Sequence, residues 1–226
     1  MSEPLVSVVI PVFNGEEFLR EALHSVFGQT YSQMEVLVAD DGSTDQSVAI
    51  AREFPLVTVL GGAHSGVSST RNRAVEASRG EFVAFLDADD TWYPAKLVRQ
   101  VALAASEPHV DVVMALQDYR FDGPIPAWFR GPTDGGTEPG FLPSSWLLRR
   151  RCWDTVGGFD LALSHGEDID WLARARDLGV NIATVEERLL TRRIHAGNAS
   201  GAPTESRKGL LTSLRMSVNR KHGAQA

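Results

Sequence analysis

Three carboxylates crowd the end of an apolar stretch in the segment GEFVAFLDADDTW. Asp87, Asp89 and Asp90 follow residues whose types are typical of a buried strand. Carboxylates this close together repel one another and lose hydration, and a bound divalent cation offsets both costs. The cluster therefore predicts a metal-dependent enzyme.

The elements that position these carboxylates follow a regular alternation. Five short runs of apolar or β-branched residues predict strands, over residues 5–12, 34–39, 57–60, 81–86 and 111–116. Helical patterns separate them, over about 18–26, after the Ser43/Thr44 cap, over about 68–77 and from near Pro94. This alternation predicts an α/β fold whose Rossmann-like, mostly parallel central sheet is flanked by helices on both faces.

Polar residues follow three of the predicted strands. Asn14 follows the first, the pair Asp40 and Asp41 follows the second, and the acidic cluster follows the fourth. Ligands of open parallel sheets bind at the carboxyl ends of the strands. We therefore expect these side chains to share one crevice.

The second half of the chain is less regular. Ten glycines and prolines interrupt residues 120–145, and this composition predicts a long active-site loop, with a floppy insertion as the alternative. A helix is expected from about Glu167 to Asp177, and strands near Ile182 and over 189–194.

Composition limits the classes that fit. The chain has 226 residues, 43% of them hydrophobic and 23% charged, as expected for one globular domain. No apolar run is long enough to span a membrane and no leader precedes the first strand, so we expect a cytoplasmic protein. The single cysteine, Cys152, is expected to be a buried thiol.

The net charge of −7 is unevenly distributed, because residues from Arg188 onward carry +7. This basic tail, predicted as a helix over 201–226, could contact phosphates or the inner membrane face peripherally, or could be a solvated helix surface. No aromatic residues alternate with the basic ones, so nucleic acid is not an expected partner.

Five segments together resemble family 2 glycosyltransferases of the GT-A fold: VSVVIPVFNGEEFLREALHSVFGQT, VLVADDGSTDQS, GVSSTRNRAVEASRGEFVAFLDADDTW, VGGFD and GEDIDW. The resemblance implies a metal-dependent transfer of a sugar from a nucleoside-diphosphate donor to an acceptor hydroxyl, with inversion at the anomeric carbon. UDP is the default nucleotide. The acceptor would be a glycan, a lipid-linked sugar, a peptide or a small molecule. About 5–116 would form the donor half of one domain and about 117–200 the acceptor half.

The resemblance also assigns residues to the donor. The loop containing Pro11, Phe13 and Asn14 would line the base and ribose, and Asp41 would accept the imide N–H of the base, with Asp40 as the alternative. Arg71 would bind a phosphate or form a plain surface ion pair.

The remaining assignments concern metal and catalysis. Asp87 would contact the ribose and the metal's water shell, and Asp89 would ligate Mg²⁺ or Mn²⁺ on the diphosphate. His195 would be a second metal ligand or a structural histidine. Asp168 would deprotonate the acceptor with Glu167 beside it, although acids also favour a helix start for purely electrostatic reasons.

Three other functions fit some of these residues. FLDADDT satisfies the pattern of aspartyl-phosphate phosphohydrolases, with Asp87 as nucleophile and Asp89 as acid and base, but that motif opens the chain in those enzymes. A sugar nucleotidyltransferase would need a glycine-rich, lysine-bearing loop after the first strand, which VFNGEEF lacks. A catalytically inactive binding module would not need the acids. The sequence also lacks the QXXRW signature of processive synthases, which favours single addition.

Overall fold

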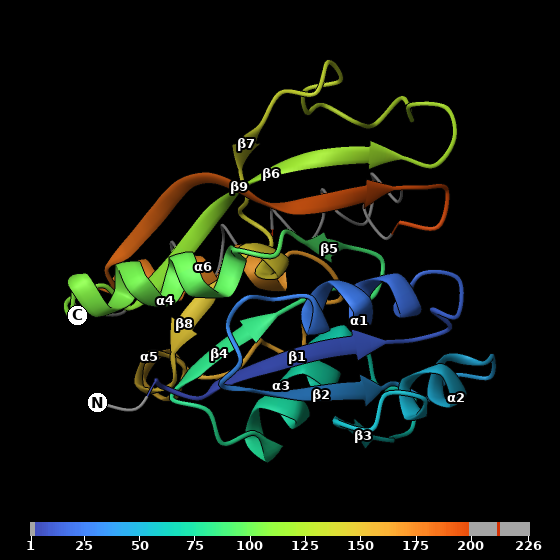
Figure 1. Cartoon of the computed structure of the whole chain (residues 1–226), viewed down its shortest axis with the longest axis horizontal. Helices are drawn as coiled ribbons and strands as arrows, with labels where there is room; N and C mark the ends of the chain where they lie inside the picture. Colours follow the sequence, from blue (N-terminus) through green and yellow to red (C-terminus); the bar gives the residue numbers. More distant parts are fainter. Residues whose placement is uncertain (1–2, 199–211, 213–226) are drawn as a thin grey trace.

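The computed structural model describes residues 3–198 and 212 (Figure 1). The helix expected over 201–226 therefore lies outside the described residues. In chain order the elements are β1 (Val6–Val12), α1 (Leu19–Phe27), β2 (Met34–Asp40), α2 (Ser47–Arg52), β3 (Val57–Leu60), α3 (Val67–Ala77), β4 (Phe82–Phe85), β5 (Thr91–Trp92), α4 (Lys96–Ser106), β6 (Val112–Phe121), β7 (Glu138–Pro139), the 3₁₀ helix η1 (Pro143–Ser145), β8 (Leu147–Arg149), α5 (Arg150–Val156), α6 (Glu167–Asp177) and β9 (Ile182–Ile194).

The first half of the chain forms the parallel part of the sheet. Strand order is β3-β2-β1-β4-β8-β6-β9-β5, with β7 attached to β6. β1 pairs in parallel with both β2 and β4, and β2 pairs in parallel with β3. All four strands were predicted. Because they are parallel, their carboxyl ends lie at one edge of the sheet, as expected.

The second half adds antiparallel pairs. The short strand β8 pairs antiparallel with β4 and with β6, and so joins the two halves. The two strands expected near Ile182 and over 189–194 are one strand, β9, which runs parallel to β6. Irregular register near Leu116 lets β9 bend while it continues to Ile194. The sheet is therefore parallel from β3 to β4 and mixed from β8 to β5.

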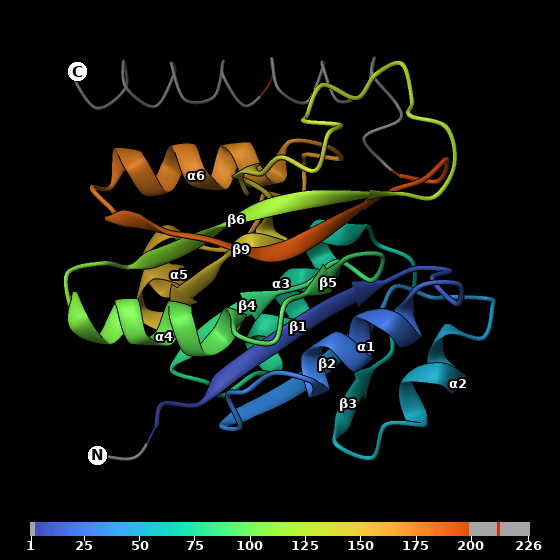
Figure 2. The ribbon, with the colours of Figure 1, turned by 45° about the horizontal axis from the view of Figure 1, so that its top comes forward.

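Each face of the sheet carries its own hydrophobic core. Alternate side chains of β1 point to opposite faces, so Val8 and Ile10 contribute to one core and Val9 to the other. Residues of α1, α2 and α4 complete the first core, and residues of α3, α5 and α6 complete the second. Figures 1 and 2 show α1 and α4 on one side of the sheet and α3, α5 and α6 on the other. Both faces are covered by helices, as predicted.

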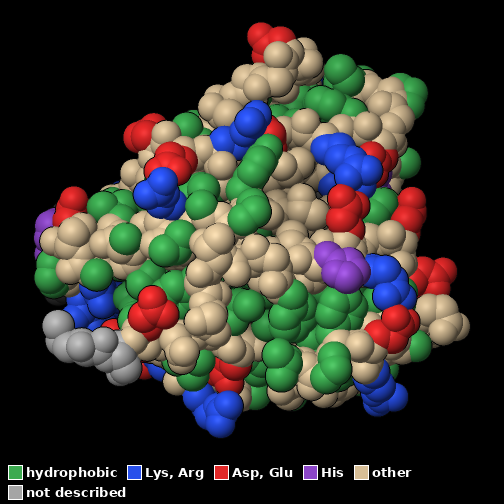
Figure 3. All heavy atoms as spheres, in the orientation of Figure 1, with side chains coloured by type: hydrophobic (Ala, Val, Ile, Leu, Met, Phe, Trp, Pro, Cys, Tyr) green, Lys and Arg blue, Asp and Glu red, His purple; other side chains and the backbone are tan. Residues whose placement is uncertain are grey.

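The surface seen in Figure 3 mixes basic, acidic and hydrophobic side chains, without one large patch of a single charge. Among the described residues, no helix is long and apolar enough to cross a membrane. Cys152 is a buried free thiol, and its burial raises its pKa to about 12.

Candidate active site

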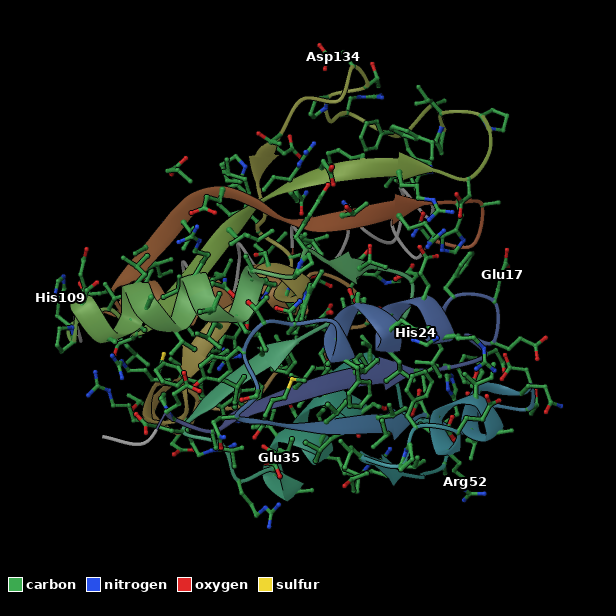
Figure 4. The ribbon with its side chains drawn as sticks, viewed as in Figure 1. Glu17, His24, Glu35, Arg52, His109 and Asp134 are labelled. Carbon is green, nitrogen blue, oxygen red and sulfur yellow. The ribbon has the colours of Figure 1, made fainter. Side chains whose placement is uncertain are left out.

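A cleft of about 960 Å³ opens at the carboxyl ends of β1, β2, β4 and β9. The first turn of α6 and both ends of the long segment between β6 and η1 also line it. Glu17, labelled in Figure 4, lies in the loop between β1 and α1 at this cleft. All ten residues that the sequence assigned to a site line the cleft: Pro11, Phe13, Asn14, Asp41, Arg71, Asp87, Asp89, Glu167, Asp168 and His195.

Asp89 and His195 meet although they are far apart in the sequence. Asp89 follows β4 and His195 follows β9, and Nε2 of His195 lies 3.0 Å from Oδ2 of Asp89. Nδ2 of Asn198 donates to the same carboxylate oxygen at 3.0 Å, and the backbone N–H of His195 donates to Oδ1 of Asn198 at 2.6 Å. Burial raises the pKa of Asp89, and the nearby charge of Asp87 adds to this effect.

This pair fits a divalent cation that is shared with phosphate. Residues 3–198 contain no group of three or more His, Cys, Asp or Glu arranged as a complete metal cage. Mg²⁺ commonly takes only one or two protein ligands and completes its shell with phosphate oxygens and water. A carboxylate and an imidazole at the rim of an open cleft therefore suit an ion that arrives with a diphosphate.

Arg71 is occupied by two carboxylates. Its side chain is only 4% exposed, and its two terminal nitrogens donate to Asp87 Oδ1 at 2.6 Å and to Glu167 Oε1 at 2.8 Å. Burial alone would lower the pKa of Arg71, but the charges of Asp87 and Glu167 more than offset this and raise it. Arg71 is therefore not a surface ion pair, because its guanidinium is buried and joins the end of β4 to the start of α6. A contact with phosphate stays a prediction.

Asp168 lies in the first turn of α6, where the positive end of the helix dipole faces the cleft. Its Oδ1 accepts the backbone N–H of Ile169 at 2.8 Å. Burial and the neighbouring charge of Glu167 raise the pKa of Asp168 to about 6, although Arg71 partly opposes the shift. Asp168 is therefore a carboxylate at neutral pH that binds a proton readily.

Two neighbouring turns meet at Asn14, which lines the cleft. Asn14 has a positive φ of 50°, and its Oδ1 accepts the backbone N–H of Thr44 at 2.8 Å. Ser43 and Thr44 therefore bind the β1 loop, whereas α2 begins at Ser47, whose N–H donates to Asp45 Oδ1 at 2.9 Å. The predicted Ser43/Thr44 cap is wrong, because these residues fasten two loops together.

Asp40 and Asp41 have separate surroundings. The carboxylate of Asp40 accepts the backbone N–H groups of Gly42 and Ser43, which stabilises the turn away from the cleft. Asp41 lines the cleft. Burial would raise the pKa of Asp41, but hydrogen bonds from Ser65, Thr70 and Gly66 outweigh burial and lower it. Of this pair, Asp41 alone is in a position to contact a molecule bound in the cleft.

Asp90 is buried beside Asp89 and contacts different partners. Its Oδ1 accepts the backbone N–H of Arg193 at 3.0 Å, and burial, followed by the charge of Asp89, raises its pKa. Arg193 Nε donates to the carbonyl of Asp89 at 3.0 Å, and its other nitrogens bind Asp122 and Glu21. These bonds fix the backbone around Asp89 and Asp90.

Several residues in or beside the cleft were not identified from the sequence. Ser144 in η1 accepts the backbone N–H of Asp87 at 3.0 Å, and the ring of Phe18 lies 4.5 Å from that of His195. His64 lies against Phe13 and Asp41. Of these residues, only Asn198 could have been found from the local sequence, because it lies three residues after His195 and Asn side chains often bind nearby backbone groups. The other three contacts join segments distant in sequence.

The long segment predicted as an active-site loop contacts the cleft at its two ends. Asp122, Leu142 and Pro143 line it, whereas residues 123–141 do not. Phe129, in this segment, packs edge to face against Tyr119 of β6, with 4.7 Å between the ring centroids. The segment is therefore anchored by an aromatic cluster, which argues against a floppy insertion.

A mixed α/β sheet with an acidic cleft at its carboxyl edge is the arrangement of the GT-A glycosyltransferases, and comparison with known proteins defines the family. The model for "Glycosyl transferase family 2" matches residues 7–155. The chain belongs to glycosyl transferase family 2, as its motifs predicted.

Two curated bacterial relatives illustrate the similarity. The chain is 36% identical over 159 residues to the uncharacterized glycosyltransferase YibD of Escherichia coli strain K12, over 67% of this chain and 46% of YibD. It is 28% identical over 217 residues to the putative glycosyltransferase EpsH of Bacillus subtilis strain 168, over 86% of this chain and 62% of EpsH. The matches span about half of YibD and about three fifths of EpsH.

Solved structures share the fold. S. aureus TarS 1–349 in complex with UDP has a TM-score of 0.71 at 23% identity, over 84% of this chain and 60% of that chain. The mannosyltransferase PcManGT from Pyrobaculum calidifontis, in complex with GDP-Man and Mn²⁺, has a TM-score of 0.76 at 19% identity, over 96% of this chain and 65% of that one. These similarities confirm the predicted GT-A fold.

Proposed function

We propose that the chain is an inverting glycosyltransferase that moves a sugar from a nucleoside-diphosphate donor to an acceptor hydroxyl and adds a single sugar to each acceptor. The observation that carries the proposal is the meeting of three groups in one cleft: the pair of Asp89 and His195, and the separate carboxylate of Asp168. The pair of Asp89 and His195 is suited to bind a cation on the diphosphate, and Asp168 is suited to accept a proton from the acceptor hydroxyl. TarS in complex with UDP and PcManGT in complex with GDP-Man and Mn²⁺ support both the ligand class and the cation.

In this proposal Asp89 and His195 would hold Mg²⁺ or Mn²⁺ against the diphosphate. When bound, the cation neutralises the negative charge that develops on the departing nucleoside diphosphate. Asp87 faces the same region, and Arg71 fixes its carboxylate at 2.6 Å. Phe13, Asn14 and Asp41 would line the nucleoside, with uridine as the default.

Asp168 acts on the acceptor. Its carboxylate takes the proton of the acceptor hydroxyl while the oxygen of that hydroxyl forms the new bond to the anomeric carbon. The bond from that carbon to the diphosphate oxygen breaks on the opposite face, so the configuration inverts. Glu167 is bound to Arg71 at 2.8 Å, which leaves Asp168 as the available base of the pair. The acceptor would lie between the start of α6 and the ends of residues 122–143.

The phosphohydrolase alternative is less consistent with these contacts. It requires Asp87 as a free nucleophile, whereas Arg71 donates to Asp87 Oδ1 at 2.6 Å and the family model covers this motif as part of a longer sugar-transfer sequence. A purely binding role gives no reason for a carboxylate whose pKa is raised to about 6 at the cleft wall. A glycosyltransferase uses all of these groups.

The test is the release of nucleoside diphosphate from a panel of UDP-sugars and GDP-mannose, with Mn²⁺ or with EDTA. We expect release that requires the cation and that falls by at least about 100-fold in Asp89→Asn and in Asp168→Asn. The variant His109→Ala is a suitable control, because Figure 4 shows His109 on the opposite side of the molecule from Glu17. Release that persists with EDTA and in both cleft variants would refute the proposal.

A further inference from the structure

The carboxylate of Asp41 is saturated with donors. Its Oδ1 accepts the backbone N–H of Ser65 at 2.8 Å, the hydroxyl of Ser65 at 3.2 Å and the hydroxyl of Thr70 at 2.9 Å. Its Oδ2 accepts the backbone N–H of Gly66 at 3.0 Å and lies 2.9 Å from Nδ1 of His64. An ionised carboxylate offers about four lone-pair positions. No position is left for a donor on a ligand.

Of the two donors on Oδ2, only His64 can leave without disturbing the fold. Ser65 and Gly66 bind through the backbone, and Thr70 is buried in the first turn of α3. The side chain of His64, in contrast, is 62% exposed. The position on Oδ2 that His64 occupies is therefore the exchangeable one.

The ring of His64 also covers a neighbouring apolar surface. Its centroid lies 4.2 Å from that of Phe13, with 31° between the ring planes. The side chain of Phe13 is 48% exposed apart from this contact, and both residues line the cleft. Nδ1 of His64 also lies 3.3 Å from the backbone oxygen of Asp41, and because this oxygen and Oδ2 can only accept, Nδ1 carries the proton. His64 thus presents a flat ring to Phe13 and a ring N–H to Asp41.

We propose that His64 occupies the position of the donor's base in the nucleotide-free protein, and that the base binds by replacing the imidazole ring. The inference rests on the proposed function, since it assumes that a nucleoside binds between Phe13 and Asp41. The protein therefore carries an internal competitor for its own substrate. The apparent affinity for nucleotide is lowered by the fraction of molecules in which the ring of His64 is in place.

The same contacts select a class of base. A base that replaces His64 must stack on Phe13 and point a ring N–H at Asp41. Uracil and thymine offer N3–H and guanine offers N1–H, whereas cytosine and adenine present an unprotonated ring nitrogen that a carboxylate repels. UDP, dTDP and GDP therefore fit this position, and CDP and ADP do not.

Release of His64 needs only a side-chain rotation. A β-carbon at Gly42 would lie 3.0 Å from the backbone nitrogen of His64, so the two turns are in close contact. The backbone N–H groups of the next two residues are bonded to Asp41. The loop is therefore held by its backbone while the imidazole is free to turn into solvent. A substitution at His64 should leave the fold intact.

The test compares His64→Ala with His109→Ala by calorimetric titration of UDP in the presence of Mn²⁺. His109 is a matched control, because its side chain is 69% exposed and also faces a carboxylate, that of Glu107 at 3.8 Å. We expect His64→Ala to bind UDP about three- to tenfold more tightly than the wild type, as a base position covered for most of the time predicts. His109→Ala should match the wild type.

Pyrophosphate with Mn²⁺ serves as a ligand without a base. Its affinity should be the same in the wild type and in His64→Ala, because it does not use the position between Phe13 and Asp41. Weaker or unchanged UDP binding in His64→Ala, or an equal gain for pyrophosphate, would overturn the role of His64 while leaving the proposed function in place. A wild-type protein that binds none of UDP, dTDP and GDP would overturn both.

Discussion

Replacing Asp168 by asparagine should make the protein more stable and inactive at once. Burial and the charge of Glu167 raise the pKa of Asp168 from 3.8 to about 6 in the folded protein. Below the lower value both folded and unfolded chains are protonated and the group costs nothing. As the pH rises from 3.8 to about 6, Asp168 loses its proton in the unfolded chain before it does so in the folded protein, so the free energy of unfolding decreases.

The size of the effect follows from the shift. About two pKa units correspond to about 3 kcal/mol of destabilisation above pH 6. This is an upper value, because Asp168 is only half-buried and water screens part of the cost. Asparagine has the same shape and keeps an oxygen for the N–H of Ile169. The gain should therefore approach about 3 kcal/mol at pH 8 and shrink to about 1 kcal/mol at pH 4.5.

Thermal unfolding of the wild type and Asp168→Asn at these two pH values, without nucleotide or metal, measures the difference. For a chain of this size the gain at pH 8 corresponds to a melting temperature higher by about 6 to 12 °C. Asp154→Asn is the control, because Asp154 is exposed on α5 and lies outside the cleft. A variant that is equally stable or less stable at pH 8, or a gain that does not depend on pH, would refute the raised pKa of Asp168.

Three further predictions concern activity, the buried arginine and the cation. The rate of sugar transfer should fall tenfold per pH unit below about 6, the pKa of Asp168, because only its deprotonated form accepts the proton; a rate independent of pH between 4.5 and 7.5 would contradict this. Arg71→Met should lower the free energy of unfolding by about 3 to 5 kcal/mol, since it strands two carboxylates, and Arg20→Met, which breaks the exposed pair with Glu53, should cost far less in the same denaturant titration. In Asp89→Asn and His195→Ala, Mn²⁺ should no longer increase the affinity for UDP in calorimetry; an increase equal to that of the wild type would exclude them as ligands.

The parallel half of the fold was predictable because its strands are continuous apolar runs. β1, β2, β3 and β4 are bounded by polar or turn-forming residues, and the helices between them carry clear apolar faces. β8 has only three residues and directly precedes α5, so no period of two could emerge from its sequence. Its antiparallel pairing with β4 and β6 depends on tertiary contacts.

The site shows the same division. Asp41, Asp87 and Asp89 follow strands, so the sequence placed them at one edge of the sheet before any contact was known. The pairing of Arg71 with Glu167 spans 96 residues and depends on how α6 packs against α3. No local pattern encodes that contact, so the sequence alone suggested a phosphate contact or a surface ion pair for Arg71, and not a buried guanidinium between two carboxylates.

The central claim is that Asp89 and His195 together hold a cation against the diphosphate of the donor. Anomalous diffraction at the manganese edge, from crystals grown with UDP and Mn²⁺, tests it most directly. The account predicts one strong peak bonded to Oδ2 of Asp89, to Nε2 of His195 and to oxygens of both phosphates. A peak elsewhere, or UDP bound in the cleft without manganese between these two side chains, would contradict it.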